Sequence, residues 1–492
     1  MPRSMKVWMK KLLSVALSVS LLVSINSPNI YAAAAVEDTS AIDPLLKKPY
    51  LELLELAPTL QFTSRQFDQV RARLKDEEKA KKDQLKAKVE NFEKQIKAAQ
   101  DQLKQLNAKG AAETSEIETQ RQAIHCQIQN YQDELAKTKI ERETAVPVEF
   151  ENYYAKLDLI EKWPAAKREI AQMIASNQAH TRKWGDAQDI GFRTIADKQE
   201  DDIKAGQEAV QKLKQFGMLP KEIEDPVVTE YVNRIAQNIA RNSDLKVPLH
   251  LTVLNSKEVN AFALPGGYLF VNRGLLEETQ TEAQLAGVLA HEISHDVARH
   301  GNRLMKRATI ASVVYQAAQV AALIFTGGAA GIGTYYALQY GFQGLGLVLS
   351  LQLLGVSRDY ELEADLLGVQ YLWKAGYNPE GFIQFFDLMA SKEGYVEKTS
   401  FFRTHPAFYD RIVTSYREIS FLPAQEQAVD NTSEFQSVKA HLKEIQKSLD
   451  AEDKDAPTLY KRVKGCEEPN PDKTKPPFHL SSEGAALAPA AL

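Results

Sequence analysis

The clearest chemical signal in the sequence is a pair of histidines four positions apart. Residues 291–295 read His-Glu-Ile-Ser-His, and the apolar residues before them have helical spacing. Residues four apart share one face of a helix, so that His291 and His295 can bind one metal ion. Glu292 points to the side, where its carboxylate can take a proton from an attacking water molecule. The pattern is typical of a zinc hydrolase, and the alternative is two surface histidines on an ordinary helix.

A second group of acidic residues follows at positions 357–365. Glu361 and Asp365 are four apart and share a helical face. Catalytic zinc has three protein ligands and one open position, so that Glu361 completes a His2Glu set. Asp365 can accept a hydrogen bond from the second ring nitrogen of a ligand histidine and so fix its tautomer. The alternative is a solvated acidic face, which is the expectation for Glu363.

The two motifs are separated by residues 308–357, which contain no charged residue. The segment is apolar enough to suggest a membrane hairpin. Its repeated glutamines and glycines, which are costly or helix-weakening in lipid, instead favour helices that are buried around the site or touch a membrane surface. In both interpretations the two motifs of the proposed metal site flank this uncharged segment in the sequence.

The elements that position these motifs lie within residues 186–448. Residues 199–216 and 226–242 have the spacing of amphipathic helices, and Thr281 with Gln284 starts the helix of the histidine pair. Residues 249–254 and 268–271 have the composition of strands and are separated by a Pro-Gly-Gly turn. We expect a mainly α (α+β) fold with a small β-sheet.

The rest of the chain differs sharply from this domain. Residues 1–35 are basic, then apolar, then end in four alanines, which predicts a secretory signal; an uncleaved membrane anchor is the alternative. Residues 36–64 are predicted as a linker and residues 143–185 as a helical connector. Residues 449–492 are rich in Asp, Lys, Pro and Ala, which predicts a disordered tail.

Residues 65–142 show a heptad pattern interrupted by a short segment that contains glycine. Apolar residues recur at alternating spacings of three and four, first from Leu85 to Leu106 and again from Ile117 to Leu135. We expect an N-terminal antiparallel coiled-coil hairpin, which either binds a partner or serves as a spacer or oligomerisation element. Cys126 and Cys466 have no expected catalytic role, and whether they pair is left open.

Composition excludes several classes of protein. The chain has 492 residues, a formal net charge of −5, 44% hydrophobic and 25% charged residues. These values exclude a collagen-like, wholly disordered or polytopic membrane chain. The acidic balance argues against nucleic-acid binding, and two cysteines cannot form a disulfide framework. A site built from histidine and glutamate is what remains for metal chemistry.

Together these motifs resemble a known family, the zinc metallopeptidases related to the HtpX membrane protease and the CAAX prenyl endopeptidase, in its secreted bacterial branch. The resemblance covers about residues 201–442. It rests on the motifs already described and on four others: Asp225-Pro226, Asn-Ala-Phe-Ala-Leu-Pro-Gly-Gly at 260–267, Arg299-His300, and Thr404-His405-Pro406 with Arg411. It implies a zincin-like domain with one Zn²⁺ per chain, held by His291, His295 and Glu361, with Glu292 as general base.

Three further expectations concern residues around the site. Peptide substrates can pair with the extended segment Asn260, Ala261, Phe262 and Ala263, for which a core strand is the alternative. His405 either stabilises a turn or acts as a fourth zinc ligand or oxyanion stabiliser. His300 is expected to pack at or cap the end of its helix.

The resemblance also implies a biological role. The expected function is a zinc endopeptidase that cleaves misfolded or stalled cell-envelope proteins, exported across the inner membrane to the periplasm. The alternative is an envelope chaperone or assembly factor with little proteolysis, whose hairpin binds the partner. Contact with a membrane surface is expected through residues 308–357.

Overall fold

The computed structural model describes residues 37–108, 115–178, 185–215, 219–305, 358–391 and 409–454. Over these residues the protein is mostly helical with one three-stranded sheet, which confirms the expected fold class. The predicted signal segment, residues 308–357, His405 and the tail from residue 455 lie outside the described residues. The chain divides into Met1–Thr39 and Ser40–Leu492, and the elements below belong to the second unit.

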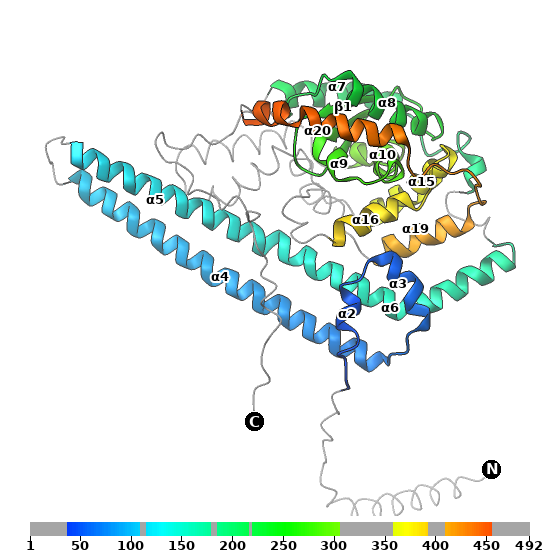
Figure 1. The fold of residues 1–492 in the computed structure, drawn as a ribbon, viewed down its shortest axis with the longest axis horizontal. Helices are drawn as coiled ribbons and strands as arrows, with labels where there is room; N and C mark the ends of the chain where they lie inside the picture. Colours follow the sequence, from blue (N-terminus) through cyan, green and yellow to red (C-terminus); the bar gives the residue numbers. More distant parts are fainter. Residues whose placement is uncertain are drawn as a thin grey trace, which may run out of the picture. The chain divides into compact units, whose positions relative to one another are not determined.

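The predicted hairpin corresponds to two long helices, α4 (Ser64–Ala108) and α5 (Ser115–Ile140), which lie side by side (Figure 1). Three seam residues from the two helices are buried together: Val89, Ile96 and Leu135. Phe92 and Tyr131 pack against this cluster. Cys126 in α5 is disulfide-bonded, and Cys466, the other cysteine of the chain, lies outside the described residues. None of the helices in the described ranges has the length and apolarity needed to cross a membrane.

A π-helical segment, η2 (Glu141–Ala145), joins α5 to α6 (Val146–Ala175). Proline at position 147 lies in the first turn of α6 and has no N–H to donate. One carbonyl in the preceding turn therefore lacks its usual donor, and the chain forms a single π-helical turn at this point, as π-helices inside α-helices usually do. The chain continues in helical form from α5 into α6 without a loop.

The segment that the sequence suggests as a linker, residues 36–64, contains short helices in the structure: α2 (Asp43–Leu46), α3 (Tyr50–Leu56) and η1 (Ala57–Thr59). Their apolar side chains are buried against α6. Trp163 of α6 donates its indole N–H to the carbonyl of Leu54 (2.7 Å), and the hydroxyl of Tyr50 donates to Asn152 Oδ1 (2.6 Å). These buried hydrogen bonds fix α3 on α6.

A buried carboxylate joins α3 to the domain that carries the histidine motif. Asp387 lies in α16 (Gly381–Ser391) and accepts hydrogen bonds from the backbone N–H groups of Tyr50 and Leu51. Burial raises the pKa of Asp387 to about 6, although the two N–H groups oppose this shift. Lys156 of α6 is also buried, and burial lowers its pKa to about 8. The contact between the helical scaffold and α16 is therefore sensitive to pH.

This contact predicts how stability depends on pH. The pKa of Asp387 is higher in the folded protein than in the unfolded chain. Its protonation therefore contributes to folding stability below about pH 4, and this contribution is lost as the pH rises through about 6. The pKa shift corresponds to roughly 3 kcal/mol of folding stability. In urea denaturation, the stability of the wild type relative to Asp387→Asn should fall across this window. If the difference in stability between the wild type and Asp387→Asn does not change with pH, the raised pKa of Asp387 is contradicted. Asp410→Asn, which replaces an exposed acid, is the control.

The domain that carries the histidine motif is built from helices around the sheet. It begins with η4 (Ala187–Asp189), α7 (Glu200–Gln215) and α8 (Pro226–Arg241). Asp225 caps α8 by accepting from the N–H of Val228 (3.1 Å), and Pro226 occupies the first position, where a missing N–H costs nothing. The other helices are as follows: α9 (Arg273–Glu278), α10 (Glu282–Val297), α11 (His300–Met305), α15 (Arg358–Lys374), α16, α19 (Tyr409–Phe421) and α20 (Ser433–Lys454).

The sheet has the strand order β1-β3-β2, in which β1 (His250–Leu254) is parallel to β3 (Tyr268–Asn272) and β2 (Ala261–Leu264) is antiparallel to it. Gly266 and Gly267 in the turn between β2 and β3 both have positive φ (82° and 88°), which glycine adopts readily. A Cβ at Gly267 would also lie 2.1 Å from the carbonyl oxygen of Pro248. Of the three described strands, β3 is central, and β1 and β2 lie at the two edges.

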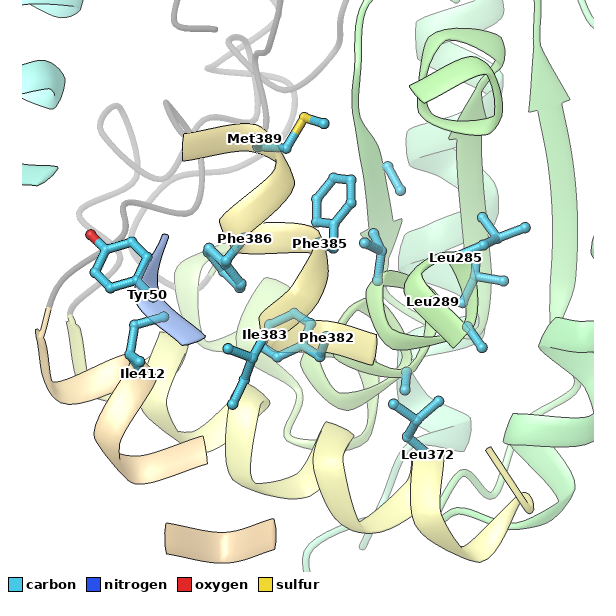
Figure 2. Close-up of a cluster of buried hydrophobic side chains, with 14 of the residues drawn as sticks. Tyr50, Leu285, Leu289, Leu372, Phe382, Ile383, Phe385, Phe386, Met389 and Ile412 are labelled. Carbon is cyan, nitrogen blue, oxygen red and sulfur yellow. The ribbon is translucent and has the colours of Figure 1, made fainter. Parts of the chain in front are cut away.

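Helix α10 lies at the centre of this domain, and every one of its residues is buried. Its side chains and those of α15, α16, α19 and α3 form one apolar cluster, to which α16 contributes Phe382, Phe385 and Phe386 (Figure 2). Two glycines allow close helix contacts. A Cβ at Gly287 would lie 2.8 Å from Phe382 Cα, and one at Gly368 would lie 3.2 Å from His291 Cα. Small residues at these crossings bring α15 and α16 against the histidine motif.

Candidate metal centre

The candidate site is formed where α10 crosses α15. Helix α10 begins at the predicted cap, where Thr281 accepts a hydrogen bond from the N–H of Gln284 (3.3 Å). Its single turn from His291 to His295 directs both imidazole Nε2 atoms to one point, where they lie 3.0 Å apart. Glu361 of α15 reaches the same point, with carboxylate oxygens 3.6 Å from His291 Nε2 and 3.5 Å from His295 Nε2.

This donor set fits a metal ion of the zinc type. One atom from each of His291, His295 and Glu361 lies within 4.8 Å of the others, and all three residues are buried. Tetrahedral zinc with bonds of about 2.0–2.2 Å places neighbouring ligand atoms about 3.3–3.6 Å apart. The observed separations are close to these values. Two imidazole nitrogens and one carboxylate oxygen also leave a fourth position for water or substrate.

Asp365 lies where it can orient the first histidine. Its Oδ1 is 2.9 Å from His291 Nδ1, the ring nitrogen that faces away from the metal position. The ring of Phe382 stacks on His291 with centroids 5.2 Å apart. Burial lowers the pKa of His291, but hydrogen bonds with Asp365 and Glu361 outweigh burial and raise it to about 9. A metal ion must therefore compete with a proton at this imidazole.

Arg411 of α19 is the counter-charge of the site. Its Nε and Nη2 atoms donate to the two oxygens of Asp365 (2.6 and 2.7 Å), and Nη1 lies 3.1 Å from Glu361 Oε2. The guanidinium is 1% exposed and lies over the ring of Phe386 at 4.6 Å. One buried cation thus forms ion pairs with both carboxylates. The sequence places Arg411 in a motif but gives no reason for its position.

Glu292 is 2% exposed and lies between the two histidines in the chain. Its negative charge is one of the groups that raise the pKa of Arg411, which together outweigh the lowering caused by burial. The carboxylate therefore belongs to the same buried charge cluster as the metal-binding residues. It is the neighbour of His291 in α10, the position at which the sequence predicts the general base.

Two residues that the sequence analysis places outside the site, His300 and Glu363, also reach it. His300 Nδ1 lies 2.8 Å from His295 Nδ1, and His300 Nε2 lies 3.4 Å from Glu363 Oε2. Glu363 is 7% exposed, so the expectation of a solvated side chain is wrong: its carboxylate turns toward α11. His300 does begin α11, but it contacts a candidate ligand and does more than cap a helix. Burial lowers the pKa of His300.

The segment Asn260 to Ala263 lies beside the site. Residues 261–264 form the edge strand β2, which packs against α10. At the end of β2, the N–H of Gly266 donates to Asp296 Oδ1 (3.2 Å), which ties the turn to the last turn of α10. The strand is therefore held next to the histidine motif. The proposed role of His405 cannot be placed here, because residues 392–408 lie outside the described residues.

Known proteins are similar in sequence to the part of the chain that forms this site. Residues 226–416, which include all the site residues above, match the model of Peptidase family M48. The chain is 34% identical to a putative β-barrel assembly-enhancing protease of Vibrio cholerae over 39% of each chain. It is 34% identical to the mitochondrial metalloendopeptidase OMA1 of Schizosaccharomyces pombe over 37% of this chain and 51% of that protein.

A further relative is the metalloprotease LoiP of Escherichia coli, which is 31% identical over 38% of this chain and 69% of that protein. The chain spans about two fifths of the length of the β-barrel assembly-enhancing proteases that it matches. These matches confirm the resemblance to metallopeptidases that the sequence motifs indicate. On the family model and on the extent of the LoiP match, the chain belongs to peptidase family M48.

Proposed function

We propose that this protein is a zinc-dependent endopeptidase. The observation that carries the proposal is the buried convergence of His291, His295 and Glu361, with Glu292 in the same turn of α10. His2Glu with an adjacent glutamate is the ligand set of hydrolytic zinc sites. The names of the relatives, protease and metalloendopeptidase, support the same reaction.

The residues of the site have different roles in the proposed hydrolysis. Zinc held by the three ligands supplies Lewis acidity that polarises a carbonyl and promotes deprotonation of water. Glu292 accepts the proton of the attacking water and delivers it to the leaving amine. Asp365 holds the ring of His291 through Nδ1, and Arg411 forms ion pairs with both neighbouring carboxylates.

Substrate is proposed to bind along β2. The N–H of Asn272 donates to the carbonyl of Asn260 (3.0 Å), which makes these two residues a hydrogen-bonded pair of the antiparallel ladder. Such pairs alternate along a ladder, so that the N–H and C=O groups of Ala261 and Ala263 point away from β3. An extended peptide can add to this edge as another strand, which brings its backbone beside α10.

Replacement of Ala263 by proline tests this binding mode. Proline removes the outward N–H without removing a hydrogen bond to β3, and edge strands accept proline. Loss of one hydrogen bond should raise KM for a peptide substrate about 3- to 10-fold, with the zinc content unchanged. Ala263→Val keeps the N–H and is the control. Equal KM values for the proline and valine variants would contradict pairing at this residue.

The substrates are proposed to be misfolded or stalled proteins of a bacterial cell envelope. The basic and apolar pattern of residues 1–35 supports export, and the names of several relatives refer to β-barrel assembly. The α4–α5 hairpin offers a long surface for a partner, and residues 308–357 are the proposed contact with a membrane.

Chelation tests the proposed activity directly. The purified protein should cleave an unfolded envelope protein, lose this activity with a zinc chelator, and recover it when zinc is added back. Recovery should fail in His291→Ala, which loses a ligand. Cleavage that continues in the chelated protein would exclude the zinc peptidase. A Glu292→Gln variant that fully complements a deletion strain would favour the chaperone function instead.

A further inference from the structure

The two candidate ligand histidines have different partners behind them. Both turn Nε2 to the metal position and Nδ1 away from it. Behind His291 lies a carboxylate, Asp365, at 2.9 Å. Behind His295 lies a third imidazole, His300, at 2.8 Å from Nδ1 to Nδ1. His291 thus has the usual carboxylate partner of a ligand histidine, whereas the partner of His295 is an imidazole whose role has to be explained.

We infer that His300, supported by Glu363, is the positioning residue of His295. An imidazole that offers the lone pair of Nε2 to a metal carries its hydrogen on Nδ1. His295 Nδ1 then donates, and His300 Nδ1 accepts. The inference rests on the proposed metal-binding role of His295.

The second nitrogen of His300 agrees with this assignment. A neutral imidazole that accepts at Nδ1 carries its hydrogen on Nε2. This atom is the one that lies 3.4 Å from Glu363 Oε2. Each hydrogen in the series from His295 through His300 to Glu363 therefore points to an acceptor. A carboxylate at the end of such a series is the usual support of a ligand histidine, here placed one residue further away.

The local backbone is built to bring His300 back to His295. On a continuous helix, residues five apart are separated by about 140° around the axis and face different sides. Arg299 interrupts the helix with φ of 55°, a left-handed conformation that is rare for residues other than glycine. Its guanidinium binds both oxygens of Asp202 (2.6 and 2.7 Å), which holds this conformation.

The ring of His300 is also fixed in orientation. It is 1% exposed and stacks on Tyr360 of α15, with centroids 4.4 Å apart and planes at 13°. The guanidinium of Arg303 lies over the Tyr360 ring at 5.6 Å and near Glu363 Oε2 at 3.4 Å. Only rotation about one axis remains, and the contacts with His295 and Glu363 fix it.

Substitutions separate positioning from packing. His300→Phe keeps a flat ring for Tyr360 but removes the acceptor, whereas His300→Asn places an amide oxygen near the position of Nδ1. Zinc affinity, measured by chelator competition, should fall about 10- to 100-fold in His300→Phe and recover largely in His300→Asn. The thermal stability of the metal-free proteins, measured in parallel, reports any loss of packing.

His250 supplies a matched control. It also stacks on a tyrosine, Tyr268, with centroids 5.0 Å apart, but it is exposed on β1. His250→Phe should leave zinc affinity unchanged. If His300→Phe binds zinc as tightly as the wild type, the positioning role fails while the proposed function stands. If the wild type does not bind zinc, both fail.

A measurement on the unmodified protein avoids any folding defect of the variants. Histidines labelled with ¹⁵N report which ring nitrogen carries hydrogen in the zinc-loaded full chain. We expect the hydrogen of His295 on Nδ1 and that of His300 on Nε2. A hydrogen on Nδ1 of His300 would overturn the inference.

Discussion

Replacing Glu292 with glutamine is expected to abolish most peptide hydrolysis while zinc stays bound. Glutamine is isosteric with glutamate but cannot accept the proton of the attacking water. General acid–base catalysis contributes about 10²- to 10⁴-fold to rate, so kcat/KM should fall by that factor. Zinc binding should persist because Glu292 is not among the three residues that converge on the metal position. Steady-state kinetics and metal analysis of the same preparation measure both quantities.

A matched substitution controls for the loss of a negative charge. Glu230 lies exposed on α8, so Glu230→Gln should leave hydrolysis and zinc content at wild-type values. If Glu292→Gln keeps wild-type activity, Glu292 is not the base. If it loses zinc together with activity, its carboxylate supports the metal and the proposed division of roles is wrong.

Replacing Arg411 with methionine is expected to destabilise the metal-free protein strongly. Arg411 is 1% exposed, and its removal leaves Asp365 and Glu361 buried without their cation. Breaking a buried ion pair from one side costs about 3–5 kcal/mol. The free energy of unfolding, measured in urea on the chelated protein, should fall by about that amount. The zinc-loaded protein should lose less, because the metal supplies positive charge to Glu361.

The double variant shows whether the cost comes from the unpaired carboxylate. Arg411→Met with Asp365→Asn removes the charge on both sides, so the double variant should be less destabilised than the sum of the two single variants. Arg417→Met is the control for the loss of an arginine from the same helix. Arg417 contacts Met173 and the ring of Phe421, which are not residues of the candidate site. Strict additivity of the two changes would contradict a direct interaction between Arg411 and Asp365.

The parts of the site that the sequence predicts are those set by local geometry. His291 and His295 are one helical turn apart, as are Glu361 and Asp365, so each pair must share a face once the helix forms. The strands were also visible, because the Pro-Gly-Gly turn and the β-branched and aromatic residues lie close together in the chain. The meeting of the two helices was inferred from the ligand number that zinc requires, and the structure brings them together at Gly368.

The parts that the sequence did not predict depend on tertiary contacts or on one unusual dihedral angle. The helical pattern through 295–300 gives no sign that Arg299 turns left-handed, so the sequence predicts only that His300 packs at or caps the end of its helix. Glu363 alternates with Glu361 and Asp365 and was expected in solvent, but α11 covers it. Asp387 binds the backbone of α3, 337 positions away, and no local pattern signals such a contact.

The most direct test of the account is an anomalous-difference map collected at the zinc absorption edge from crystals of the zinc-loaded protein. The account predicts a single strong peak within bonding distance, about 2.0–2.2 Å, of His291 Nε2, His295 Nε2 and a carboxylate oxygen of Glu361. A map without a peak at this position, or with the zinc bound by other residues, would contradict it.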